Sequence, residues 1–156
     1  MSKNTMSETG MAEDMIRSYV QFGCAEIHAM GLFFKANAEI SNGMIDVEDN
    51  EVLERQTQKI EQYQKDIEVY AYMRRSVMQK LFSMFDGDKD MWCQAKHLGI
   101  GAMTLFEAYE ASDNDLELLM LCNEANRAFT IAMSRFLGTE ITDCAACFAD
   151  MLKGEM

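Results

Sequence analysis

The sequence predicts an all-α protein, an antiparallel four-helix-type bundle with a long second helix and a short fifth helix at the C-terminus. Two observations favour this class. The 156 residues contain no proline, a residue that breaks long helices. Apolar residues recur at helical spacing along most of the chain, which is typical of helices that bury one face. We therefore expect a single helical bundle domain over residues 12–156, after a disordered leader over residues 1–11.

The first helix is expected to run from about Ala12 to Ser41. Its middle part, between Cys24 and Ala38, is apolar almost all round, which indicates a central and well-covered helix. The helix should end at Asn42 and Gly43, because glycine readily adopts the left-handed conformation that follows a helix.

The second helix should begin near Asp46 or Asp49, since either can act as an N-cap, and should end near Phe85. Apolar residues recur every seven positions along it, with Arg74 as one charged interruption. At 1.5 Å per residue this helix would be about 60 Å long.

The third helix is expected over residues 89–111, after a break at Gly87, and the fourth over residues 113–137, ending at Gly138. A fifth should cover residues 140–152. Helices three and four would each be about 35 Å long, so the second helix would extend past them by several turns. A second copy of the chain could cover that overhang, which predicts a homodimer through helix two.

The charge weighs against nucleic acid as a direct ligand, because phosphate binding needs a basic surface and the net charge is −12. Residues 1–56 carry a net charge of −6, residues 57–106 of +1, and residues 107–156 of −7. Acidic ends would steer the protein toward a basic partner. No apolar stretch is long enough to span a membrane. The odd number of cysteines, five, favours a reducing compartment. This would be the cytoplasm, or the cytoplasm of the infected host if the protein is viral.

Three pairs of residues could bind a transition metal. Each pair has i, i+3 or i, i+4 spacing, which places both side chains on one helix face. The pairs are Cys24 with His28, Cys93 with His97, and Cys144 with Cys147. Thiolate and imidazole are ligands for Zn or Cu(I), so a small metal or thiol protein is one hypothesis. The alternative is that these cysteines are buried as small hydrophobic residues.

Other acidic pairs favour ordinary structural roles. The acids at 86, 88 and 90 resemble the start of a calcium loop, but Met91 and His97 occupy positions that need glycine and glutamate. Glu107 and Glu110 share a helix face and are expected to be solvated surface residues. No catalytic motif is present, so we expect a protein that is not an enzyme.

The favoured hypothesis is a non-enzymatic protein–protein interaction module, of the adaptor, chaperone or inhibitor type, with an acidic surface suited to a basic partner. The first half of the second helix has a thin apolar seam and a wide polar face. The tyrosines on the seam would give large amphipathic contacts. The partner-binding residues expected there are Leu53, Ile60, Tyr63, Ile67 and Tyr70.

Overall fold

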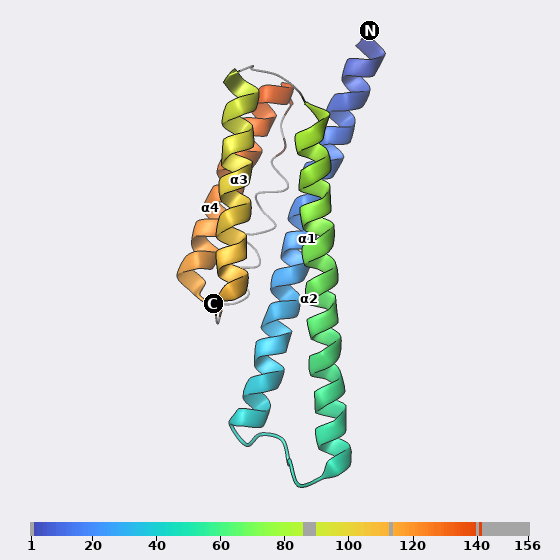
Figure 1. Ribbon diagram of the computed structural model, residues 1–156, viewed down its shortest axis with the longest axis vertical. Helices are drawn as coiled ribbons and strands as arrows, with labels where there is room; N and C mark the ends of the chain where they lie inside the picture. Colours follow the sequence, from blue (N-terminus) through green and yellow to red (C-terminus); the bar gives the residue numbers. More distant parts are fainter. Residues whose placement is uncertain (1, 86–89, 113, 140, 142–156) are drawn as a thin grey trace.

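The computed structural model describes residues 2–85, 90–112, 114–139 and 141. These residues form four helices and no strand: α1 (Ser2–Ser41), α2 (Asn50–Met84), α3 (Asp90–Ala111) and α4 (Leu116–Leu137). The helices pack in pairs, α1 along α2 and α3 along α4, and the two helices of each pair run in opposite directions (Figure 1). The all-α class is therefore confirmed. Within the described ranges no helix is long and apolar enough to cross a membrane.

The first helix begins earlier than expected. It starts at Ser2 and not near Ala12, so the segment predicted to be a disordered leader is helical from its second residue. The correction has a physical reason. A polar sequence is compatible with exposed helical turns as well as with disorder, and residues 1–11 contain one glycine and no proline. Ala12 and Ile16 are fully buried, which anchors the adjoining turns.

The helix ends follow the local sequence signals. Asp49 caps α2, because its carboxylate accepts hydrogen bonds from two backbone amides at 3.1 and 3.4 Å. Asp115 caps α4 in the same way, slightly later than the predicted start at 113. Gly138 ends α4 as predicted: its φ of 71° is left-handed, and its amide donates to the Ser134 carbonyl at 2.9 Å.

The first pair of helices is longer than the second. α1 has 40 residues and α2 has 35, whereas α3 and α4 have 22 each. The ends of α1 and α2 that residues 42–49 connect therefore project beyond the lower ends of α3 and α4 (Figure 1). We call this projecting part the extension, and on α2 it reaches to Asp66, because the next residue, Ile67, lines a groove with Ala111 at the end of α3. α1 covers one side of the predicted overhang of α2. The amide of Gln56, for example, is buried and donates to the Ala36 carbonyl at 3.0 Å.

The two pairs meet through large side chains at the opposite end of the molecule from the extension. The ring of Phe136 in α4 lies 5.0 Å from that of Phe85, which follows α2, and the ring of Trp92 in α3 lies 6.3 Å from that of Phe82 in α2, measured between centroids. Tyr19 of α1 meets Phe129 of α4 edge-on at 6.1 Å. These contacts give the pairs a shared core. The predicted fifth helix lies outside the described residues except for Ile141, which is buried.

Candidate functional site

A buried cluster of charged residues lies where α1, α2 and α3 meet. Its centre is Arg74, whose side chain is fully buried at the position that interrupts the apolar heptad of α2. The Nε of Arg74 donates to Oε1 of Glu26 in α1 at 3.1 Å, and both side chains are 0% exposed. Its Nη2 lies 3.5 Å from Oε2 of Glu110 in α3. The guanidinium carbon lies 3.9 Å from the centre of the Phe106 ring, a cation–π contact. One arginine thus links three helices.

A second arginine extends the cluster to the surface. Arg75 donates from Nη2 to Oε1 of Glu110 at 2.6 Å, and its Nε lies 3.8 Å from Oε1 of Glu107. Glu110 therefore joins the two arginines, and only 17% of its side chain is exposed. The sequence interpretation of Glu107 and Glu110 as a solvated pair is right for Glu107, which is exposed, and wrong for Glu110. The reason is that Glu110 faces two cations of α2, a neighbour that the sequence of α3 alone does not reveal.

Burial shifts the protonation equilibria around this cluster. It raises the pKa of the Glu26 carboxyl well above its ordinary value, and a hydrogen bond with Glu110 raises it further, while the charge of Arg74 opposes both. Burial also raises the pKa of the Tyr19 hydroxyl and raises that of the Cys122 thiol to about 12. Cys122 is thus a protonated and unreactive thiol at neutral pH. The charged side chains of the cluster link α1, α2 and α3, and the Cys122 thiol near them is protonated.

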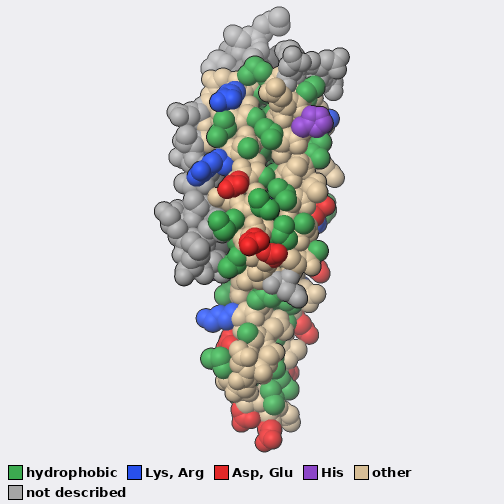
Figure 2. Space-filling model, turned by 90° about the vertical axis from the view of Figure 1, so that its left-hand side faces the viewer, with side chains coloured by type: hydrophobic (Ala, Val, Ile, Leu, Met, Phe, Trp, Pro, Cys, Tyr) green, Lys and Arg blue, Asp and Glu red, His purple; other side chains and the backbone are tan. Residues whose placement is uncertain are grey.

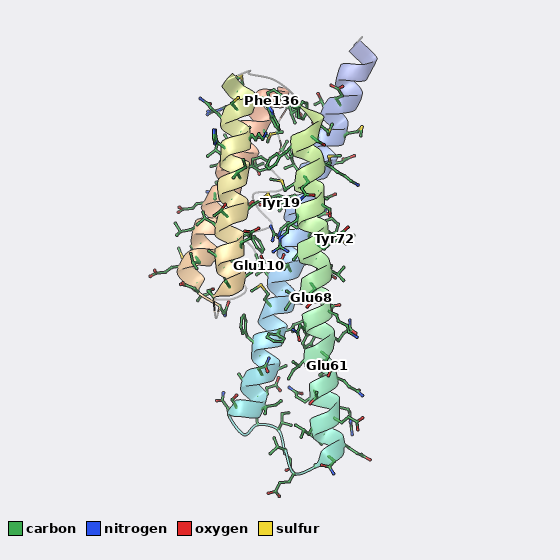
Figure 3. The ribbon with its side chains drawn as sticks, viewed as in Figure 1. Tyr19, Glu61, Glu68, Tyr72, Glu110 and Phe136 are labelled. Atoms are coloured by element: carbon green, nitrogen blue, oxygen red, sulfur yellow. The ribbon has the colours of Figure 1, made fainter. Side chains whose placement is uncertain are left out.

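A groove opens between α2 and α3 beside the cluster. It is a shallow depression of about 640 Å³ that is wide open to solvent, and it is lined by Ile67, Glu68, Ala71, Arg75, Glu107, Glu110 and Ala111. Its apolar side chains come from both helices, and three carboxylates and one guanidinium surround them. Figure 3 shows Glu110 near the lower end of α3, with Glu68 and Glu61 further down α2. The groove is thus continuous with the surface of the extension.

All five of the residues predicted to bind a partner are half-buried. They are Leu53, Ile60, Tyr63, Ile67 and Tyr70. Ile67 lines the groove, and Ile60 and Leu53 lie one and two heptads before it, on the same face of α2. The residue after each of these three is an exposed glutamate: Glu54, Glu61 and Glu68. We call these three glutamates the acidic stripe.

The tip of the extension is strongly acidic. Residues 39–54 contain six acidic residues and no lysine or arginine. Two apolar side chains are also exposed there, Met44 at 72% and Val47 at 48%. In Figure 2, Asp and Glu side chains gather at the lower end of the molecule. The same view shows hydrophobic side chains distributed over the outer face of the upper part.

The residues proposed as metal ligands are placed differently from one another. Cys24 is buried, whereas His28, Cys93 and His97 are exposed. In the part of the chain that the structure describes, no three histidine, cysteine or acidic side chains are grouped to hold a metal ion. Cys144 and Cys147 lie outside the described residues, as do positions 86–89 of the 86–90 acidic segment. The Zn or Cu(I) hypothesis therefore stays a prediction.

Sequence reasoning missed the acidic stripe and the partners of Arg74. Two signals were present. The first is Arg74, an arginine at an apolar position of the heptad, which indicates an acidic partner in the core. The second is a pair of an apolar residue and a glutamate that recurs every seven residues. Comparisons of the chain with protein-family models, with curated proteins and with solved structures gave no match. The function is therefore argued from the geometry of the site.

Proposed function

We propose that this protein is a non-enzymatic interaction module that binds a basic partner protein through the extension. The observation that carries the proposal is the face of α2 below the end of α3. There Leu53 and Ile60 are half-buried, and each is followed by an exposed glutamate. None of the described residues of α3 or α4 reaches this face (Figure 1).

The chemistry of this face suits a protein surface. Interfaces combine a partly apolar centre with a polar rim, and the seam and stripe of α2 supply both. The acidic tip adds long-range attraction, which raises the rate at which a basic partner associates. A second copy of the chain would bring its own net charge of −12 to the same surface. Charge therefore favours a basic partner over the homodimer that the overhang predicted.

The proposal includes the finer fold assignment, an antiparallel bundle closed by a fifth helix over 140–152. It is supported by the ion pairs of Arg74 to α1 and α3 and by the aromatic contacts between the pairs. A bundle of this kind would hold the extension rigidly at one end, and a rigid surface loses less entropy on binding. Adaptors, chaperones and inhibitors all act by docking of this kind.

The test is co-purification of the tagged full-length chain from its source cells, with Ile60→Lys and Tyr63→Lys as test variants. Ile131→Lys is the matched control, because Ile131 is a 47% exposed apolar residue on α4. We expect a basic protein to be retained in stoichiometric amount by the wild type and the control and lost with the test variants. Circular dichroism checks that each variant is folded. Retention of the same protein by all variants, or of none by the wild type, contradicts the proposal.

A further inference from the structure

The contact of α2 with α3 shows how this face of α2 holds a helix. Arg75 pairs with Glu110 at 2.6 Å and lies 3.8 Å from Glu107, so cations of α2 meet carboxylates of α3. Beside them, Ile67 and Ala71 of α2 and Ala111 of α3 line the groove. At this contact the carboxylates of α3 therefore face the two arginines of α2, with Glu68 of α2 and apolar residues beside the ion pairs in the groove.

The same face continues below α3 with the opposite charge. Positions seven residues apart lie about 10.5 Å apart along a helix and drift by only about 20° around it. The pair Arg74 and Arg75 is preceded at this spacing by three pairs of an apolar residue and a glutamate: Ile67 with Glu68, Ile60 with Glu61, and Leu53 with Glu54. All three glutamates are exposed. A helix that packs on this part of the face would therefore need lysine or arginine side chains at the positions where α3 has glutamates.

We propose that a basic amphipathic α-helix of the partner docks along the acidic stripe, in line with α3 and beginning at the groove. The inference rests on the proposed function and names the form of the partner. The available length of α2, residues 50–68, is about 28 Å, which corresponds to a partner helix of about five turns. Its apolar face contacts the seam of α2, and its lysines or arginines pair with the stripe.

Two occupants from this chain itself have the wrong charge. A second copy presents the same glutamates at every seventh position of its own α2. Residues 142–156 contain three acidic residues and one lysine, a net charge of −2. Like charges opposite one another disfavour binding. Charge complementarity therefore selects a basic helix from another protein.

The probe for this inference is a fluorescein-labelled synthetic peptide of three heptads, with leucines on one face and lysines flanking them. A second peptide with glutamate in place of every lysine is its control. Fluorescence anisotropy measures binding of each peptide to the full-length chain. We expect the lysine peptide to bind and the glutamate peptide not to bind. Hydrogen–deuterium exchange should show added protection over residues 53–68 in the complex.

Charge reversal locates the binding site. In the test variant both Glu61 and Glu68 are changed to lysine. The matched control changes Glu117 and Glu124, which are also exposed, also seven residues apart and lie on α4. The two variants have the same net charge. One exposed ion pair is worth roughly two- to five-fold in affinity. Reversing two should weaken binding by at least about ten-fold, and the control by less than about three-fold.

The outcomes separate this inference from the proposed function. Absence of binding by the wild type, or equal weakening in the two variants, overturns the inference, since the latter shows attraction by net charge alone. If the complex from source cells still depends on Ile60, the proposed function stands and only the helical form of the partner is wrong. If that complex is absent as well, both are wrong.

Discussion

Replacing Arg74 with methionine tests whether the buried cluster fastens the helices. Methionine retains a straight, flexible chain that fills the space of the arginine stem, so the change removes mainly the charge. The carboxyls of Glu26 and Glu110 would then face each other without a cation. The contact of the guanidinium with the Phe106 ring would also be lost.

The expected cost follows from burial. Removing one partner of a buried ion pair typically costs about 3–5 kcal/mol. Glu26 can take up a proton more readily than an ordinary carboxyl, because its pKa is raised, which places the cost near the lower end. We therefore expect Arg74→Met to lower the free energy of unfolding by about 3 kcal/mol. With a urea dependence of about 2 kcal/mol per M, the midpoint falls by about 1.5 M.

Urea unfolding followed by circular dichroism measures this shift. Arg55→Met is the control, because Arg55 is 73% exposed and lies 3.9 Å from an exposed glutamate, so its loss should cost less than about 0.5 kcal/mol. The reasoning is refuted if Arg74→Met costs no more than Arg55→Met.

Three further predictions concern stability. Burial raises the pKa of Glu26, so folding favours its protonated form. Its contribution to the free energy of unfolding is therefore fully present below the ordinary pKa of 4.5 and is lost as pH rises toward the folded-state pKa. Wild type should therefore lose stability relative to Glu26→Gln between about pH 5.5 and about pH 8.5, by at most about 1.4 kcal/mol per pH unit, and a constant difference contradicts this. Gly99→Ala should destabilise by about 1–3 kcal/mol in thermal melts, because the new Cβ would lie 2.9 Å from a ring carbon of Phe129. Gly101→Ala meets nothing within 4 Å and should stabilise by up to about 1 kcal/mol, so equal effects of the two would count against the packing. Asp115→Ala should cost about 0.5–2 kcal/mol in urea unfolding, because two backbone amides lose their acceptor, whereas Asp115→Asn should retain most of the cap.

Local signals in the sequence predicted much of the fold. The cap at Asp49 and the end of α4 at Gly138 depend on side-chain and backbone chemistry within a few residues. The start of α1 was missed because polar residues do not distinguish an exposed helix from a disordered segment. α1 packs along α2 and covers one side of its first half, where Gln56 donates to the Ala36 carbonyl, and the homodimer through α2 stays a prediction.

The cluster could not be predicted in the same way. The spacing of apolar residues shows which face of a helix is buried, but it does not show which other helix packs against that face. Glu26 and Arg74 are 48 residues apart in sequence, and Glu110 is further still along the chain, so their meeting depends on the packing of helix pairs. Arg74 at a seam position did indicate a buried acid, but many glutamates could have supplied it. The residues predicted to bind a partner include Leu53, Ile60 and Ile67, which lie one heptad apart on the same face of α2, and their role in binding stays a prediction.

Site-specific photo-cross-linking in source cells tests the central claim most directly. A photoreactive amino acid replaces Gln64, an exposed residue of the extension, and in a matched variant replaces Gln94, an exposed residue on α3. The account predicts a cross-linked product at position 64, with a basic protein as the attached chain, and none at position 94. A product at position 94 alone, or a product at 64 that consists of two copies of this chain, would contradict it.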